Sequence, residues 1–253
     1  MTSEEKMVSV ILPVYNAENS LKDTIDSALS QSHLNLELII IDDCSTDGSL
    51  RIARQCAEND ARIRVLNNCV NRSVAFCRNC GIEAARGEYI AFLDSDDIWV
   101  QDKLERQISL LIETGSQFTC ASYDFIDSEG KPVLRPHYVP DKLDFQSILR
   151  ENVILCSSVC VDAALLKEHI FRDDYYHEDY VLWLELFRLP IRIVTDRSIL
   201  THYRFINTSR SYNKLRSAKE RWRIYRDFLN MSIFESLYYF SQYAVNGLKK
   251  YHK

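Results

Sequence analysis

Short apolar runs alternate with amphipathic segments through the first hundred residues of this chain. The runs are rich in Val, Ile and Leu, which is typical of buried strands. Each is followed by a segment whose apolar residues recur three or four positions apart, as Leu21, Ile25 and Ala28 do, and this spacing predicts a helix. The predicted strands are 8–13, 36–42, 63–67 and 88–94, and the predicted helices are 18–31, 51–58 and 73–85. Strands that alternate with helices predict an α/β fold with a parallel sheet.

The second half of the chain has a more mixed order of elements. The sequence SEGKP at 128–132 is typical of a turn, and it separates two strand-like runs as in a β-hairpin. The predicted hairpin strands are 119–127 and 133–139, the further strands are 157–161, 191–195 and 199–205, and the closing helices are 215–229 and 232–248. We therefore expect a mixed, mostly parallel central sheet flanked by helices, with a helical appendage at the C-terminus.

Two acidic clusters stand directly after predicted strands. The dipeptide DD at 42–43 follows LELIII, and the tetrapeptide DSDD at 94–97 follows YIAFL. Ligands of open α/β sheets bind beyond the carboxyl ends of the strands, so both clusters are expected to face one crevice. Several like charges at one place cost free energy unless a cation offsets them, and hard oxygen ligands suit Mg²⁺ or Mn²⁺ better than zinc. The Asp-x-Asp pattern is thus a candidate clamp for a metal-bound diphosphate, and the alternative is that Asp and Ser cap a helix that starts near Asp102.

Charge is distributed unevenly along the chain. The 253 residues carry a net charge of −5. From Arg204 to Lys253 there are eleven Lys and Arg against three acidic residues, so this stretch carries +8 and the preceding 203 residues carry −13. An acidic body would repel the phosphates of nucleic acid, and we expect no nucleic-acid partner. The basic stretch also contains several aromatic residues, which suits the surface of an anionic bilayer.

The N-terminal sequence MTSEEKMVSV lacks the charged-then-apolar order of an export signal. No apolar run approaches the ~18 residues of a membrane span, so we expect a cytoplasmic protein that is soluble or peripheral at the inner face of the membrane. In that compartment the eight cysteines are expected to be reduced thiols. Cys77 and Cys80 form a C-x-x-C, but the flanking pattern is helical and Cys156 and Cys160 lie in a strand-like run, so packed thiols are favoured over zinc.

Five motifs of the chain resemble those of the family 2 inverting glycosyltransferases with the GT-A fold. They are SVILPVYNAENSL, IIIDDCSTDGS, NRSVAFCRNCGI, GEYIAFLDSDD and HEDYVLWLELF, in the family's order and at about its spacing. The resemblance covers about residues 7–212, and it includes small bacterial enzymes of lipopolysaccharide O-antigen or capsule synthesis. It implies a Rossmann-like GT-A domain at 1–206, with a nucleotide-sugar half at about 1–100 and an acceptor half at about 101–206, followed by basic, aromatic helices at 207–253.

By this resemblance, the donor is a nucleotide diphosphate sugar, and the base is uracil as in enzymes that use a UDP-sugar. The residues implied at the nucleotide are Pro13, Tyr15, Asp42, Asp43, Asn71, Arg78 and Asp94. The chemistry agrees, because a carboxylate such as Asp43 can accept the imide N–H of uracil and the ring of Tyr15 can stack on the base. Taken alone, Tyr15 is also typical of a packing residue at a strand end, and Arg78 of a solvated helix charge. Ser73 stands where the family commonly has glycine, so we expect a different shape for the loop on the phosphate side.

The resemblance also implies a metal and a base. Asp96 is implied as the direct ligand of Mn²⁺ or Mg²⁺, with Asp94 beside it and Asp97 as an accessory acid, and the metal offsets the charge of the leaving diphosphate. Inverting transfer needs a base opposite the leaving group, because the acceptor hydroxyl loses its proton as it attacks the anomeric carbon. The family has that base at the second acid of the ED pair, here Asp179, and Glu178 helps to place the acceptor or the base. Without the family, a helix N-terminus that favours acidic residues explains the pair equally well.

The implied acceptor is a glycan or a polyprenyl diphosphate-linked sugar. His177 and His202 are further candidates for contacts with the acceptor or the metal, although a single histidine is more often structural. The Q-x-x-R-W motif of processive synthases is absent, because Ala218 stands three residues before Arg221, so we expect one sugar to be added per encounter. Residues 215–250 have apolar residues at helical spacing among basic ones, and they are expected to contact a membrane, to cover the sheet or to form a homodimer surface.

Two other functions fit parts of the pattern. A sugar-nucleotide pyrophosphorylase shares the α/β sheet and the metal but needs a glycine-rich phosphate loop after the first strand, where this chain has ILPVYNAEN and no glycine before Gly48. The same absence disfavours dinucleotide-dependent oxidoreductases and P-loop kinases. A non-catalytic sugar- or lipid-binding scaffold of the same fold would not need the acids at 94, 96 and 179, which are intact. We therefore expect a metal-dependent inverting hexosyltransferase.

Overall fold

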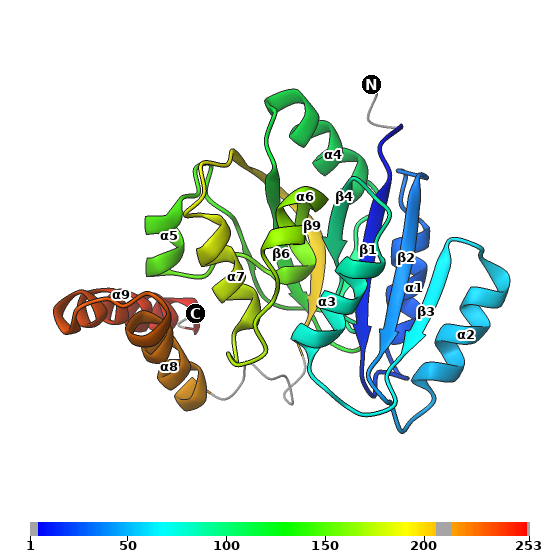
Figure 1. Ribbon diagram of the computed structural model, residues 1–253, viewed down its shortest axis with the longest axis horizontal. Helices are drawn as coiled ribbons and strands as arrows, with labels where there is room; N and C mark the ends of the chain where they lie inside the picture. The colour runs from blue at the N-terminus through cyan, green and yellow to red at the C-terminus, as the bar shows by residue number, and fades with distance from the viewer. Residues whose placement is uncertain (1–4, 206–213, 252–253) are drawn as a thin grey trace.

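The computed structural model describes residues 5–205 and 214–251 of the chain. Within these ranges the chain forms a nine-stranded sheet with helices on both faces (Figure 1). The strands lie in the order β3-β2-β1-β4-β8-β6-β9-β5, and β7 pairs with β6 outside this path. Their bounds are β1 Val8–Val14, β2 Leu36–Asp42, β3 Ile63–Asn67, β4 Tyr89–Phe92, β5 Ile98–Trp99, β6 Phe118–Ile126, β7 Pro132–His137, β8 Val159–Asp162 and β9 Ile193–Arg204. The mixed α/β fold expected from the sequence is confirmed.

The N-terminal half of this sheet is parallel. β1 pairs in parallel with β2 on one side and with β4 on the other, and β2 pairs in parallel with β3. β8 then joins β4 to β6 in the antiparallel direction, whereas β6 and β9 are parallel to each other. The carboxyl ends of β1, β2 and β4 consequently lie at one edge of the sheet.

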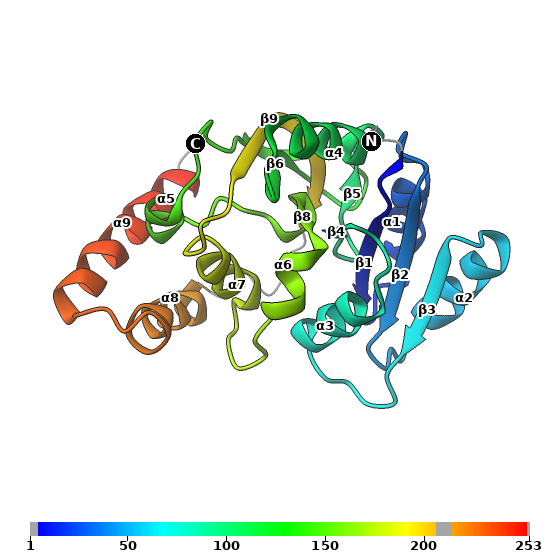
Figure 2. The same ribbon diagram turned by 45° about the horizontal axis from the view of Figure 1, so that its top comes forward.

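Helices cover both faces of the sheet, and this explains why β1 and β2 are buried along their whole length and mostly apolar. Val10 and Leu12 of β1 pack in one core cluster with α1, α2 and α4, whereas Ile11 packs in the other cluster with α3, α6 and α7 (Figure 2). The helix bounds are α1 Leu21–Leu29, α2 Ser49–Asn59, α3 Val74–Ala84, α4 Lys103–Thr114, α5 Phe145–Arg150, α6 Ala163–Glu168 and α7 Glu178–Leu186. Gly81 allows α3 to lie close to the sheet, because a Cβ at this position would stand 2.5 Å from Ile11 Cγ2.

One strand prediction is wrong. The runs 191–195 and 199–205, predicted as two strands, form the single strand β9, whose pairing with β6 is irregular between Asp196 and Ile199. The polar residues at 196–198 lie in this irregular stretch, which resembles a β-bulge, and the strand continues beyond them. The short elements α5, α6 and β5 were not predicted, because they are too brief to show a periodic pattern.

Two further helices pack beside α7 and α5 (Figure 1). α8 (Lys214–Arg223) continues into a π-helical turn at Ile224–Phe228, and α9 spans Ile233–Tyr251. Tyr225 and Leu229 belong to the core cluster that contains α7. The predicted domain boundary between 206 and 207 lies outside the described residues. In residues 5–205 and 214–251, every helix falls short of the length or the apolar content that a bilayer crossing needs.

All eight cysteines are free thiols, as the sequence predicts. Four of them are buried in the core, and burial raises the pKa of Cys120 and of Cys160 to about 12. A thiol that stays protonated is a poor nucleophile and a poor metal ligand. These side chains therefore act as small apolar packing residues.

Lys103 is a fully buried cation at the start of α4. Its Nζ donates a hydrogen bond to Gln107 Oε1 at 2.6 Å and lies 4.1 Å from the centroid of the Trp99 ring. Burial lowers the pKa of Lys103 from its ordinary value of 10.5 to about 7. Between pH values of about 7 and 10.5, Lys103 is protonated in the unfolded chain and mostly uncharged in the folded chain. The free energy of unfolding that depends on Lys103 therefore increases as the pH rises from about 7 to 10.5.

We expect Lys103→Met to remove this pH dependence, because Met has a similar length and does not titrate. For the wild-type chain, the Lys103 contribution to the free energy of unfolding should rise by on the order of a few kcal/mol across the interval. Urea unfolding at both ends of the interval measures the difference. Lys131→Met, at an exposed turn residue, is the matched control and should behave as wild type. If the two variants show the same pH dependence, the buried lysine is not its source.

Candidate active site

Most of the predicted nucleotide and metal residues lie at or just beyond the carboxyl ends of β1, β2 and β4, at one edge of the sheet (Figure 1). Pro13 is buried within β1, where it pairs with Ile41 of β2. Val14 pairs with Asp42 where β1 and β2 end, and the backbone N–H of Leu93 donates to the carbonyl of Ile11 at 3.0 Å where β4 ends. Backbone pairing of the strands therefore brings the loops that begin after residues 14, 42 and 93 together.

The loops after β1 and β2 hold each other in place. Asn16 and Cys44 have positive φ angles of 50° and 62°, so the chain turns sharply just beyond each strand. The backbone N–H of Asn16 donates to Ser45 Oγ at 3.1 Å, and Asn16 Oδ1 accepts the backbone N–H of Thr46 at 2.8 Å. Tyr15 stands at this turn with 51% of its surface exposed. An exposed ring on a fixed loop can stack on a planar base.

Asp43 is buried, and its carboxylate is partly engaged. Asn68 Nδ2 donates to Oδ1 at 2.7 Å, and the backbone N–H of Arg72 lies 3.0 Å from both carboxylate oxygens. Asn71 Nδ2 donates to the backbone carbonyl of Asp43 at 3.1 Å. Because an ionised carboxylate has about four acceptor positions, Asp43 can still accept an N–H group from a ligand.

Asp42 and Ser73 support the loops around Asp43. The Asp42 carboxylate is buried, and its Oδ2 accepts the backbone N–H of Ser45 at 3.0 Å. Ser73 has an extended backbone with φ of −170°, and its Oγ caps α3 by accepting the backbone N–H of Phe76 at 3.1 Å. The serine that departs from the family's usual glycine thus adds a helix cap, and the backbone at this position does not need a glycine.

Asp97 anchors the acidic loop that follows β4. Its side chain is fully buried and accepts the Ser157 hydroxyl at 2.5 Å and the backbone N–H of Arg204 at 3.2 Å. Ser157 Oγ in turn accepts the backbone N–H of Asp94 at 3.0 Å. Burial, together with the nearby charges of Asp96 and Asp94, raises the pKa of Asp97 well above its usual range. Through these contacts, Asp97 therefore holds the acidic loop in its conformation.

Asp96 has the donor chemistry that a divalent cation needs. Burial and the adjacent Asp94 raise the pKa of Asp96 to about 6, and among the described residues no side chain donates a hydrogen bond to its carboxylate. The part of the chain that the structure describes holds no cluster of three metal-binding His, Cys, Asp or Glu. Mg²⁺ or Mn²⁺ commonly takes one or two carboxylates and completes its shell with water and substrate phosphates. The pair of acids therefore fits a hard cation that arrives with a diphosphate.

Arg78 joins this acidic loop to the start of α7. Its guanidinium is buried, with Nη2 donating to Asp94 Oδ1 at 2.6 Å and Nη1 donating to Glu178 Oε1 at 2.9 Å. The guanidinium carbon lies 5.1 Å from the centroid of the Phe171 ring. One cation thus brings the acid at the end of β4 and the ED pair into a single site. The sequence gives Arg78 as a nucleotide contact or a solvated charge, and neither interpretation anticipates this bridge.

The ED pair opens α7, where the helix N-terminus favours negative charge. Glu178 is buried and held by Arg78, whereas Asp179 is half-buried. Asp179 Oδ1 accepts the backbone N–H of Tyr180 at 2.7 Å, which fixes the direction of the carboxylate. His177 immediately precedes the helix. Asp179 is therefore the more accessible acid of the pair.

Residues from distant elements support the acidic loop, and sequence reasoning missed them. Arg204 Nε donates to the backbone carbonyl of Asp96 at 3.0 Å. Ser20, just before α1, and Thr24 of α1 donate to the backbone carbonyl of Ser95 at 2.9 Å and 3.1 Å. No local pattern marks these residues, because each reaches the loop from an element far away along the chain.

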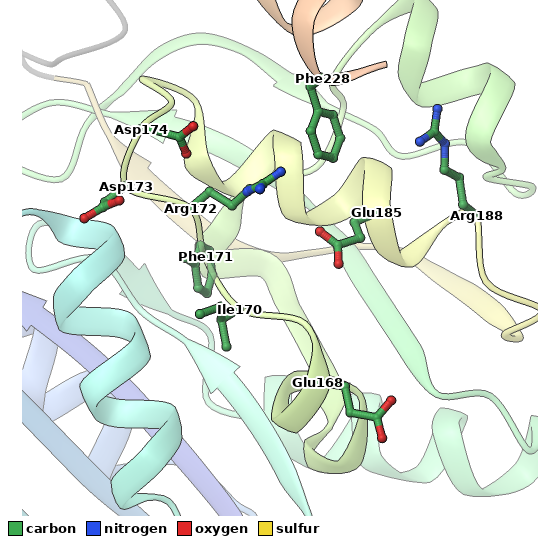
Figure 3. A pocket seen from close by; sticks show the side chains of 9 residues that line it. All are labelled: Glu168, Ile170, Phe171, Arg172, Asp173, Asp174, Glu185, Arg188 and Phe228. Atoms are coloured by element: carbon green, nitrogen blue, oxygen red, sulfur yellow. The ribbon is translucent and has the colours of Figure 1, made fainter. Parts of the chain in front are cut away.

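Two cavities are lined mostly by residues other than the predicted site residues. The first, of about 600 Å³, lies against α7 and the loop before it (Figure 3) and is lined by Glu168, Ile170, Phe171, Arg172, Asp173, Asp174, Glu185, Arg188 and Phe228. The second, of about 560 Å³, includes His202, whose Nδ1 lies 2.6 Å from Asp124 Oδ1. Neither includes Tyr15, Asp43 or Asp96.

Comparisons with known sequences point to one family. The model of glycosyl transferase family 2 matches residues 9–173. TuaG of Bacillus subtilis, named as a teichuronic acid biosynthesis glycosyltransferase, is 36% identical over 99% of this chain and 99% of its own length. WfgD of Escherichia coli is named as a UDP-Glc:alpha-D-GlcNAc-diphosphoundecaprenol beta-1,3-glucosyltransferase. It is 34% identical over 98% of this chain and 96% of its own length.

Comparisons with solved structures confirm the GT-A fold. Residues 1–349 of Staphylococcus aureus TarS in complex with UDP-GlcNAc match with a TM-score of 0.75 at 20% identity, covering 94% of this chain and 71% of that one. The mannosyltransferase PcManGT from Pyrobaculum calidifontis, in complex with GDP-Man and Mn²⁺, matches with a TM-score of 0.71 at 18% identity. The match covers 94% of this chain and 73% of the PcManGT chain.

The Arg78 bridge can be tested through stability. Arg78→Met should lower the free energy of unfolding by about 3–5 kcal/mol, because it removes the buried cation that Asp94 and Glu178 share. Arg78→Met combined with Glu178→Gln should recover part of this loss, since the charges are then closer to balance. Urea unfolding measures both changes.

Arg197→Met is the matched control, because the pair of Arg197 and Asp141 is exposed, with 3.4 Å between Nη1 and Oδ1. Removing this exposed ion pair should lower the free energy of unfolding by less than about 1 kcal/mol. An Arg78→Met variant that is as stable as the Arg197 variant would mean that the bridge does not hold the site together.

Proposed function

The chain belongs to glycosyltransferase family 2, and from this premise we propose that it transfers a sugar from a UDP-sugar to a lipid-linked acceptor with inversion at the anomeric carbon. The observation that carries the proposal is the Arg78 bridge, with 2.6 Å to Asp94 and 2.9 Å to Glu178. A single displacement needs the leaving group and the base within one cleft, and the bridge supports that arrangement.

The uridine is proposed to bind across the ends of β1 and β2. The exposed ring of Tyr15 stacks on the base, and Asp43 accepts the imide N–H with its remaining acceptor capacity. The full set proposed at the nucleotide is Pro13, Tyr15, Asp42, Asp43, Asn71, Arg78 and Asp94. Within this set Asp42 supports the loop, and Arg78 acts through its contact with Asp94.

Asp96 and Asp94 are proposed to hold Mn²⁺ or Mg²⁺ together with the diphosphate. When bound, the cation offsets the charge that develops on the leaving diphosphate. The raised pKa of Asp96, about 6, supports this role, because burial and the neighbouring Asp94 leave a carboxylate that a cation would stabilise. Asp97 keeps the loop in shape through Ser157.

Asp179 is proposed as the base. The acceptor hydroxyl oxygen bonds to the anomeric carbon while the bond from that carbon to the β-phosphate oxygen breaks. The electron pair of the broken bond leaves with the diphosphate, and the hydroxyl proton passes to the carboxylate of Asp179. The backbone N–H of Tyr180 orients that carboxylate, and Glu178 is held beside it by Arg78.

The acceptor is proposed to be a sugar on a polyprenyl diphosphate, used in the synthesis of a bacterial surface polysaccharide such as O-antigen or capsule. WfgD and WfaP of Escherichia coli are both named for transfer to GlcNAc-diphosphoundecaprenol, and WfaP is 32% identical over 97% of this chain. The named role of TuaG in teichuronic acid biosynthesis supports the same product class. The transferase domain is proposed to span 1–206 and the helical appendage 207–253.

A transfer assay tests these assignments. The full chain is incubated with Mn²⁺, a panel of nucleotide sugars and a GlcNAc-diphosphate lipid, and the product is identified by mass spectrometry. We expect turnover with a UDP-sugar. Asp96→Asn should lose both the calorimetric heat of binding UDP with Mn²⁺ and the transfer. Asp179→Asn should keep the binding and lose about 10²–10⁴-fold in transfer rate.

Asp141→Asn, at a surface carboxylate that is 75% exposed, is the control and should match wild type. If Asp179→Asn loses the binding of UDP with Mn²⁺ but keeps the turnover, the roles of the two sites are assigned wrongly.

α9 offers a surface for the membrane in which a polyprenyl acceptor lies. Phe234, Leu237, Tyr238 and Val245 are between 49% and 85% exposed, and Leu215 on α8 is 87% exposed. Exposed lysine and arginine side chains of α8 stand near Leu215 along the chain, at Arg216 and Lys219. Apolar side chains beside basic ones suit an anionic lipid surface, and we propose that this face binds the inner face of the membrane peripherally.

Flotation with vesicles that contain anionic lipids tests this surface. The double variant Phe234→Glu with Leu237→Glu should float less than wild type, because both changes place a charge where apolar contact is proposed. Leu34→Glu, at a residue that is 73% exposed before β2, is the matched control and should float as wild type. Equal flotation of all three proteins would reject the membrane contact. A dimer that dissociates only in the double variant, with unchanged flotation, would assign the face to a second copy.

A further inference from the structure

Arginine side chains of α8 lie over the rings of tyrosines that are close to the start of α7 in the sequence. The pairs are Arg216 over Tyr176 at 4.2 Å, Arg221 over Tyr180 at 3.7 Å and Arg223 over Tyr175 at 4.8 Å, each measured from the guanidinium carbon to the ring centroid. The three tyrosines lie on either side of Glu178 and Asp179 in the sequence. We call these three pairs the arginine–tyrosine stack. It connects the C-terminal appendage to the segment that carries the proposed base.

Arg221 is the buried member of this stack. Only 5% of its surface is exposed, and its Nε and Nη1 have no hydrogen-bond partner within the described ranges. The guanidinium carbon lies 3.7 Å from the centroid of the Tyr180 ring and 4.8 Å from that of Tyr243 on α9. Aromatic faces attract a cation, but they replace only part of the solvation that a buried charge loses. Fold stability alone therefore does not explain an arginine at this position.

The tyrosine under Arg221 is directly linked to the base. Its backbone N–H donates to Asp179 Oδ1 at 2.7 Å, and its hydroxyl donates to the carbonyl of Ile148 at 3.0 Å. Tyr180 is thus fixed at both ends, and Arg221 closes the face of its ring. A shift of this ring would move the backbone N–H that directs the carboxylate of Asp179.

We propose that Arg221 is a positioning residue for the transfer step, because its contact with Tyr180 holds the carboxylate of Asp179 in line with the acceptor hydroxyl. The inference rests on the proposed function, whose base it concerns. It makes α8 a part of the active site, in addition to any contact that the appendage makes with a membrane.

Kinetics and stability together test this role. Arg221→Met keeps most of the side-chain length and removes the charge, so the melting temperature should stay the same or rise. The KM for the UDP-sugar should stay unchanged, because Arg221 does not contact the donor. The kcat of transfer should fall by about 100-fold, as expected when the carboxylate of the base moves by about 1 Å from its position beside the acceptor hydroxyl. Arg221→Lys should recover part of the kcat, since an ammonium group can also lie over the ring.

Arg188→Met is the matched control, because Arg188 lies 5.2 Å from the Phe145 ring centroid near the other end of α7. It should keep the wild-type kcat. A kcat for Arg221→Met equal to that of this control, or a parallel fall of melting temperature, kcat and donor affinity, would overturn the inference.

A second measurement decides the inference without turnover. If the wild-type chain transfers no sugar to any acceptor, the proposed function fails, but hydrogen–deuterium exchange still reports on the stack. The backbone amides of 177–181 should exchange faster in Arg221→Met than in wild type and in Arg188→Met. Equal exchange in the three proteins would overturn the positioning role.

Discussion

The ion pairs of Arg78 connect the two chemical halves of this molecule. A buried guanidinium is costly to desolvate, and it is retained in a protein interior when acids of good geometry surround it. Here those acids come from the end of β4 and the start of α7, at 2.6 Å and 2.9 Å. Two acids share one cation, and Asp96 adds a further carboxylate nearby, so the site is arranged for a positive ligand. This imbalance agrees with a metal-bound diphosphate and with a neighbouring carboxylate that accepts a proton.

The sheet supplies the rigid frame on which this charge arrangement depends. Three parallel strands end at one edge, and their loops are held by specific contacts of Asn16, Asp97 and Ser157 and not by their own sequence preferences. Burial raises the pKa of Asp97 and lowers the pKa of Lys103, so both buried groups favour the uncharged form. Polar groups that are costly to bury are common at functional sites, where stability is lost in exchange for function.

The sequence predicted the parts of the fold and site that local patterns determine. β2 and β3 have the predicted bounds, because short apolar runs between turns leave little choice of register. Acids directly after strands made Asp43 and Asp96 candidate site residues, and the family resemblance made Asp179 the candidate base; the roles of these residues stay predictions. Contacts between distant elements were not predicted: the unbroken β9, the partners of Arg78 and the support of the loop by Arg204. Each depends on which elements pack together, and no periodic pattern contains that information.

The central claim is that donor and base act from opposite sides of one anomeric carbon in a single step. The configuration of the product tests it most directly. An α-linked UDP-sugar that supports turnover is used as donor, and the product is isolated with its new glycosidic bond intact. The coupling of the anomeric proton of the transferred sugar is then measured by NMR. The account predicts a β-linked product, because one displacement inverts the carbon. An α-linked product would require two displacements or attack from the side of the leaving group, and it would contradict the roles given to Asp179 and to the Arg78 bridge.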